Sequence, residues 1–318
     1  MILPITILII GFAILIKGAD WLVSGASSLA KKHNVSDLVI GLTIVSFGTS
    51  APELIVNSIA SLQNHSDIIF GNVIGSNNLN LFVILGIVGL IMPITVQSST
   101  VWKEIPISFF AIIVVFVLSN RLFLQTNNVL SRMDGLVLLI LFLLFLFYIY
   151  KQMKTERLEL EIATKELSNW KIWGLISIGL AGLVFGGKLV VNNAIEIAVD
   201  FGVSEKIIGL TIIAAGTSLP ELVTSVVAAL KKNSDIAIGN IIGSNIFNLL
   251  LILSVSSLIN PIRYNPSFNT DMYILAGGTA FLFIAMFTLG KKKLDRWEAG
   301  ILLATFIIYT IYLIGKEV

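Results

Sequence analysis

The 318-residue chain lacks cysteine altogether and has few histidines and few charged residues. Without cysteine there is no disulfide, no thiolate nucleophile and no cysteine-ligated metal. Two histidines, His33 and His65, are too few for a His-rich zinc or di-iron centre. Charged residues make up 13% of the chain, too few to cover the surface of a soluble protein of this length. This composition also excludes disorder and a coiled coil, and a net charge of +2 excludes a nucleic-acid-binding face.

Apolar residues, in contrast, make up 56% of the chain and occur in long continuous runs. A membrane-spanning helix needs about 20 such residues. The runs do not alternate with polar residues as in a β-barrel, and the first is too long for a signal peptide. We therefore expect an all-α polytopic membrane protein with ten transmembrane helices. The expected spans are 3–29, 36–62, 68–92, 104–120, 130–150, 172–199, 204–230, 236–259, 272–289 and 298–315.

Lysine and arginine are distributed unevenly over the loops that ten spans would create. One side of the membrane would carry 14 of them and the other side 5, with Lys17 and Lys188 inside spans. Because positive residues concentrate in cytoplasmic loops, both termini are expected outside the cytoplasm of a plasma or inner membrane. The polar segment 151–171 is expected to be a cytoplasmic linker.

The chain contains an internal duplication. After a shift of 168 residues, 35–82 aligns with 203–250 without a gap, and 26 of these 48 positions are identical. The halves before and after the linker, 1–150 and 172–318, contain five expected spans each. An odd number of spans makes the second half enter the membrane from the opposite side. The sequence therefore predicts two inverted five-helix repeats, an organisation typical of secondary transporters.

Two motifs dominate the duplication. GTSAPE at 48–53 aligns with GTSLPE at 216–221, and GNVIGSNNLN at 71–80 aligns with GNIIGSNIFN at 239–248. In the first motif, a glycine followed four residues later by a proline weakens the helix and frees backbone carbonyls. Such irregular backbone is tolerated at membrane depth only where it lines a cavity or is buried in protein.

The first motif ends in a glutamate in each copy, Glu53 and Glu221. A carboxylate inside the membrane is costly, and its default interpretation is functional. A purely structural role would need a buried basic partner, and Lys17 and Lys188 are the only basic residues in the interior of the expected spans, since Arg132 and Lys206 lie at span ends.

The other repeated polar groups are hydroxyls and amides. They are Thr49, Ser50, Thr217 and Ser218 in the first motif, and Asn72, Ser76, Asn77, Asn80, Asn240, Ser244, Asn245 and Asn248 in the second. Together with the two glutamates these groups offer only oxygen to a metal. Oxygen ligands select hard cations such as Ca²⁺ or Na⁺ over zinc and copper.

The paired motifs resemble the two α-repeats of the sodium/calcium exchanger family in its prokaryotic form, and the resemblance covers nearly the whole chain. It implies four sites between spans two, three, seven and eight, three for Na⁺ and one for Ca²⁺. The implied Ca²⁺ ligands are Glu53 and Glu221 with the carbonyl oxygens of Thr49 and Thr217. The implied Na⁺ ligands are Ser46, Ser50, Glu53, Ser76, Ala214, Ser218, Glu221 and Ser244. The expected supporting residues are Asn72, Asn80, Asn240 and Asn248.

One position departs from the family pattern. Family members commonly carry aspartate at the position of Asn80 or Asn248, whereas both are asparagine here. This difference argues against the potassium-dependent branch, which typically uses aspartate there.

The resemblance implies a secondary antiporter that exchanges Ca²⁺ for Na⁺ without K⁺, by alternating access in which spans one and six slide. Ca²⁺/H⁺ exchange is the alternative, because both glutamates can bind protons. An intramembrane hydrolase using Ser50 or Ser218 is disfavoured, because no histidine or lysine lies in the motifs to activate a serine. We therefore expect no enzyme activity and no cofactor. The expected partners are the two ions and the lipid bilayer, with no nucleic acid and no obligate protein.

Overall fold

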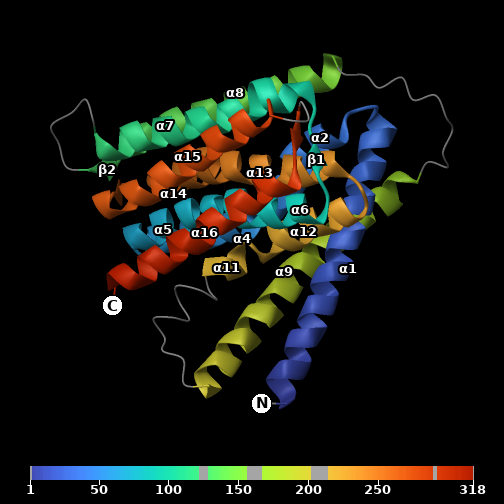
Figure 1. Cartoon of the computed structure of the whole chain (residues 1–318), viewed down its shortest axis with the longest axis horizontal. Helices are drawn as coiled ribbons and strands as arrows, with labels where there is room; N and C mark the ends of the chain where they lie inside the picture. Colours follow the sequence, from blue (N-terminus) through green and yellow to red (C-terminus); the bar gives the residue numbers. More distant parts are fainter. Residues whose placement is uncertain (1, 122–127, 156–166, 202–213, 289–291, 318) are drawn as a thin grey trace. The chain divides into compact units, whose positions relative to one another are not determined.

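The computed structural model is almost entirely helical (Figure 1). It describes residues 2–121, 128–155, 167–201, 214–288 and 292–317. Within these ranges eight helices are long and apolar enough to cross a membrane, or nine if Asp37–Thr49 and Ala51–Leu62 form one broken span. This confirms an all-α, multi-pass membrane protein. Part of the expected span 204–230 lies outside the described residues, so ten spans and the inverted repeat stay predictions.

The chain forms two compact units, and each unit combines segments from both halves of the sequence. The first unit comprises Met1–Pro52 and Tyr150–Asn240, and the second comprises Glu53–Ile149 and Ile241–Val318. The chain passes from one unit to the other within helices α4 (Ala51–Leu62), α8 (Arg132–Thr155) and α13 (Ser234–Ile246). These units are not the sequence halves 1–150 and 172–318. The division of the chain into two repeats at the linker 151–171 stays a prediction.

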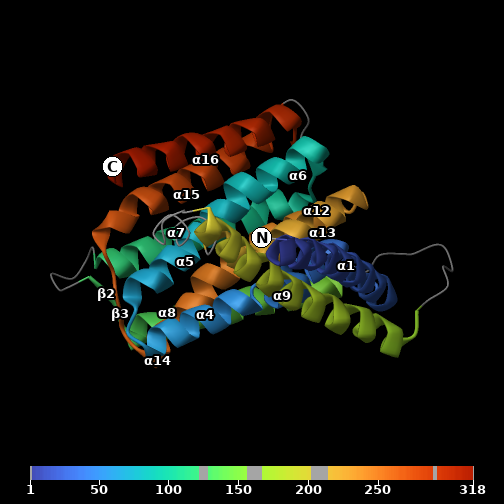
Figure 2. The same cartoon turned by 90° about the horizontal axis from the view of Figure 1, so that it is seen from below.

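Two long helices of the first unit, α1 (Ile2–His33) and α9 (Asn169–Asp200), run side by side (Figures 1 and 2). Glycines let their backbones approach closely. A Cβ atom added at Gly179 would lie 2.6 Å from the backbone nitrogen of Leu22, and one added at Gly18 would lie 2.9 Å from the carbonyl oxygen of Gly179. Close backbone packing through small residues is typical of helix pairs in membranes.

Among the described residues, the rest of the first unit consists of the end of α8, from Tyr150, and of shorter helices. They are α2 (Asp37–Ile40), a π-helical turn at Gly41–Val45, α3 (Ser46–Thr49), α11 (Ala214–Thr217), α12 (Leu219–Leu230) and the first part of α13.

The second unit contains most of the remaining helices. In chain order they are α4 from Glu53, α5 (Ser66–Asn78), a π-helical turn at Leu79–Ile84, α6 (Leu85–Ile91), a π-helical turn at Thr100–Glu104, α7 (Ile105–Asn120), α8 as far as Ile149, the end of α13, a π-helical turn at Phe247–Ile252, α14 (Leu253–Ile259), a 3₁₀ turn at Pro266–Phe268, α15 (Asn269–Ala285) and α16 (Arg296–Glu317).

Two short antiparallel strand pairs connect helix ends in this unit. Strand β1 (Ile94–Thr95) pairs with β4 (Lys293–Leu294), and β2 (Val129–Leu130) pairs with β3 (Ile262–Arg263).

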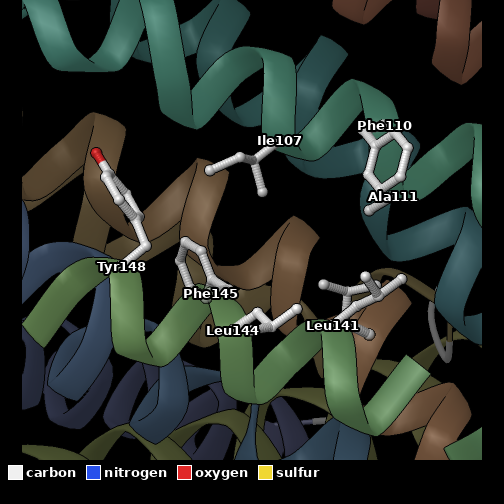
Figure 3. A pocket seen from close by; sticks show the side chains of 8 residues that line it. Ile107, Phe110, Ala111, Leu141, Leu144, Phe145 and Tyr148 are labelled. Atoms are coloured by element: carbon white, nitrogen blue, oxygen red, sulfur yellow. The ribbon is translucent and has the colours of Figure 1, made fainter. Parts of the chain in front are cut away.

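A cavity of about 190 Å³ lies along α7 and α8 in the second unit (Figure 3). Its lining side chains are Ile107, Phe110, Ala111, Leu141, Leu144, Phe145, Tyr148 and Leu250. Apart from Tyr148 the lining is apolar, so this cavity does not suit a cation. Buried oxygen-bearing side chains occur instead in the two repeated motifs.

Candidate cation site

Both copies of the GTSxPE motif interrupt a helix at the same serine. Ser50 separates α3 from α4 with φ −84° and ψ 4°, and Ser218 separates α11 from α12 with φ −90° and ψ 5°. Two residues later, Pro52 and Pro220 have no N–H, so the carbonyl four residues earlier in each copy loses its helical donor. The irregular backbone expected from the glycine and proline positions is therefore present in both copies.

In the first unit, hydroxyl groups of the first motif copy contact polar groups of the second copy. The Ser50 Oγ donates to the Glu221 Oε1 at 3.0 Å, and the Thr49 Oγ1 donates to the Asn240 Oδ1 at 3.0 Å. The four residues are each at most 3% exposed. Residues 171 and 191 positions apart in the sequence thus meet in one buried polar cluster.

Asn240 also supports the helix that carries Glu221. Its Nδ2 donates to the Glu221 main-chain oxygen at 3.4 Å and to the Ser225 Oγ at 3.0 Å. The amide is therefore oriented with its oxygen toward Thr49 and its nitrogen toward α12. The supporting role expected of Asn240 at a cation site stays a prediction.

In the second unit, Glu53 has a comparable arrangement. The Asn57 Nδ2 donates to the Glu53 main-chain oxygen at 2.7 Å and to the Asn72 Oδ1 at 2.8 Å. Glu53 is 1% exposed, as is Glu221. Asn57 and Ser225 were not among the expected site residues, although each lies four residues after its glutamate.

The second unit also contains four buried asparagines from both copies of the second motif. The Asn80 Nδ2 donates to the Asn245 Oδ1 at 3.0 Å, and the Asn248 Nδ2 donates to the Asn77 Oδ1 at 3.0 Å. Asn80 and Asn248 were expected to support the site, while Asn77 and Asn245 were expected only as further amides that offer oxygen. The sequence signal for the latter two is their identity between the copies.

The remaining expected ligands lie at the ends of short helices or in α5 and α13. In the first unit, Ser46 begins α3 and is buried, Ala214 begins α11, Thr217 ends it, and Ser218 is buried. In the second unit, Ser76 of α5 and Ser244 of α13 are buried. The role of each residue as a cation ligand stays a prediction.

The sequence matches the family described as Sodium/calcium exchanger protein over residues 3–151 and 171–315. The chain belongs to the sodium/calcium exchanger family. It is 38% identical to the putative antiporter CaxA of Alkalimonas amylolytica, with 99% of this chain and 100% of that protein aligned. It is 33% identical to the sodium/calcium exchanger MaX1 of Methanosarcina acetivorans, over 96% of this chain and 97% of that one.

The fold is also similar to a solved member of the family. A structure of the sodium-calcium exchanger NCX_Mj, soaked without Na⁺ and Ca²⁺, has a TM-score of 0.84 and 33% sequence identity. The match covers 98% of this chain and 99% of that chain. The family resemblance expected from the paired motifs is therefore confirmed at the level of both sequence and fold.

Proposed function

We propose that the chain is a secondary antiporter that exchanges Ca²⁺ for Na⁺ by alternating access, without K⁺. The observation that supports this most directly is the contact between the Ser50 hydroxyl and the Glu221 carboxylate, at 3.0 Å and out of solvent. A buried carboxylate beside a hydroxyl from the other motif copy is the kind of oxygen cluster that hard cations bind. Family membership favours Ca²⁺ and Na⁺ as these cations, because the family and a relative of this chain are named as sodium/calcium exchangers.

The proposed Ca²⁺ ligands are the carboxylates of Glu53 and Glu221 and the carbonyl oxygens of Thr49 and Thr217. Two carboxylates balance the charge of one Ca²⁺ ion, which makes their burial in the membrane affordable. The interrupted helices support the carbonyl ligands, since each interruption directly follows the threonine.

The proposed Na⁺ ligands share the two glutamates with Ca²⁺. The full set is Ser46, Ser50, Glu53, Ser76, Ala214, Ser218, Glu221 and Ser244. Because both ions would use the same carboxylates, they compete, and this competition couples their transport. An empty site would carry two buried negative charges and would therefore cross the membrane poorly.

Na⁺ is favoured over H⁺ as the coupling ion by the neutral groups around the carboxylates. A proton needs only the acids, whereas Na⁺ needs several oxygen ligands. The buried hydroxyls of Thr49, Ser50 and Ser218 supply such oxygens. The absence of a third carboxylate at positions 80 and 248 supports independence from K⁺.

The proposed orientation has both termini outside the cytoplasm and segment 151–171 inside. The cysteine-free chain allows a direct test, in which one cysteine is introduced within 156–166. An impermeant thiol reagent added to intact cells should leave it unlabelled, while a cysteine next to Arg263 should be labelled. Labelling of the first position from outside would reverse the orientation.

The transport proposal is tested in proteoliposomes loaded with Na⁺ and diluted into Na⁺-free medium containing Ca²⁺. Ca²⁺ uptake should require the outward Na⁺ gradient and should be unchanged by K⁺. A pH gradient alone should drive no uptake. Uptake driven by the pH gradient without Na⁺ would favour Ca²⁺/H⁺ exchange instead.

A further inference from the structure

Four asparagines in the second unit form two hydrogen bonds that cross between the motif copies. Asn80 donates to Asn245, and Asn248 donates to Asn77, both at 3.0 Å from Nδ2 to Oδ1. The donors occupy equivalent positions in the two copies, and so do the acceptors. The arrangement is therefore reciprocal, with each copy donating to the other.

These bonds fix which way the donor amides face. An asparagine amide has its nitrogen and oxygen on opposite sides, so a nitrogen held by one neighbour turns the oxygen away from it. The Oδ1 atoms of Asn80 and Asn248 are buried, and neither has a hydrogen-bond partner among the described residues. A buried carbonyl without a donor is unfavourable unless a cation or a water molecule occupies its lone pairs.

A second amide pair in the same unit, outside the repeated motifs, shows a contrasting arrangement. The Asn120 Nδ2 donates to the Asn269 Oδ1 at 2.9 Å, and the Asn269 Nδ2 donates back to the Asn120 Oδ1 at 3.0 Å. There each amide oxygen accepts from its partner. The motif asparagines do not close on each other in this way, and two of their oxygens are left for another ligand.

The backbone gives an independent indication at the same two positions. Asn80 is the second residue of the π-helical turn Leu79–Ile84, and Asn248 is the second residue of the turn Phe247–Ile252. Single π-helical turns within α-helices are rare and occur frequently at functional sites. The two turns also begin at equivalent positions of the duplication.

We propose that Asn77 and Asn245 are positioning residues for the exchanged cation. Asn77 accepts a hydrogen bond from the amide nitrogen of Asn248, and Asn245 accepts one from that of Asn80. Each bond points the carbonyl oxygen of the donor residue toward the cation or a water molecule bound to it. If either amide turned by 180°, its NH₂ group would face the cation and repel it. The Asn77 Nδ2 donates to the Asn245 main-chain oxygen at 3.4 Å, which orients Asn77 in turn. This inference rests on the proposed exchange of cations.

The test is a pair of double-mutant cycles on Na⁺-driven Ca²⁺ flux in proteoliposomes. Asn77→Leu removes the acceptor at similar size and should raise the KM for Ca²⁺ about fivefold, the effect of one hydrogen bond, with a smaller change in maximal rate. On an Asn248→Ala background the same substitution should change the KM less than twofold, because no amide remains to be oriented. On an Asn80→Ala background it should keep its full effect.

The mirrored cycle gives the opposite pattern. Asn245→Leu should lose its effect on the Asn80→Ala background and keep it on the Asn248→Ala background. Asn120→Leu is the matched control, because it breaks an amide pair outside the motifs, and it should leave the KM unchanged. If one leucine variant does not fold, the cycle of the other decides.

Equal effects of Asn77→Leu or Asn245→Leu on both alanine backgrounds would overturn the inference. So would a rise in KM for Asn120→Leu as large as that for Asn77→Leu. These failures are distinguishable from failure of the proposed function, in which the unmodified protein itself would show no Na⁺-driven Ca²⁺ flux.

Discussion

Glu53 and Glu221 occupy equivalent positions in the two motif copies, and the peptide carbonyl of each accepts a hydrogen bond from a side-chain amide. The donor differs. For Glu53 it is Asn57, one turn later on the same helix, at 2.7 Å, whereas for Glu221 it is Asn240 of α13 at 3.4 Å. The copies therefore share the satisfied carbonyl but not the residue that satisfies it.

The difference originates in one substitution between the copies. Position 57 is asparagine, while the equivalent position 225 is serine, which has no amide to donate. Asn240 takes over the donation in the second copy and points its nitrogen toward α12, whereas Asn72 presents its oxygen to Asn57. A single residue thus reverses the orientation of an amide that is identical in sequence.

The largest expected effect is a loss of transport that is the same for both copies of the motif. Glu53→Gln and Glu221→Gln each remove half of the proposed site's charge but keep its shape. Either change should reduce Na⁺-driven Ca²⁺ flux about 100-fold or more, because a hydrogen-bonded or cation-bound charge is lost. Folding should survive, since a neutral amide is cheaper to bury than a carboxylate. Flux in proteoliposomes and size-exclusion profiles check both points, and near-normal flux in one variant would break the equivalence of the copies.

An intermediate effect is expected where the copies meet. Ser50→Ala removes the hydroxyl that donates to Glu221 and should raise the KM for Na⁺ or Ca²⁺ about tenfold, as for a hydrogen bond to a charged group. Ser58→Ala is the matched control, because the Ser58 hydroxyl donates only locally, to the Leu54 carbonyl at 2.7 Å. The Ser58→Ala variant should keep the KM of the unmodified protein. Equal KM values for Ser50→Ala and Ser58→Ala would show that the contact between Ser50 and Glu221 does not contribute to cation binding.

The smallest expected effect concerns the difference between Asn57 and Ser225. Asn57→Ser gives the first copy the residue found in the second, and Asn72 could then turn its amide as Asn240 does. Stability should fall by less than about 1 kcal/mol and the KM should change at most about threefold. Leucine offers no oxygen to a turned Asn72 amide, so Asn57→Leu should lower the free energy of unfolding by about 1–3 kcal/mol. Thermal unfolding in detergent measures both, and equal losses would contradict the exchange of donors.

Local features of the site could be predicted from the sequence. The helix interruptions at Ser50 and Ser218 follow from Pro52 and Pro220, whose effect on the backbone depends on no distant residue. The burial of both glutamates followed from their position within apolar runs. Family membership followed from the doubled motif.

Other features depend on how distant segments pack. No spacing rule brings Ser50 to Glu221, because the contact joins segments that are far apart in the chain. Asn57 and Ser225 were not predicted because they differ between the copies, whereas the predicted site residues follow the repeated motifs. Asn77 and Asn245 are identical, but their role depends on which amide atom faces which neighbour, and a sequence does not contain that information.

The most direct test of the account is calorimetric titration of Ca²⁺ into the purified protein in detergent, with and without Na⁺. The account predicts one Ca²⁺ ion bound per chain, displaced by Na⁺, and no detectable binding in Glu53→Gln or in Glu221→Gln. Ca²⁺ binding that persists in either variant with unchanged affinity, or that Na⁺ does not weaken, would contradict a shared site built on both glutamates.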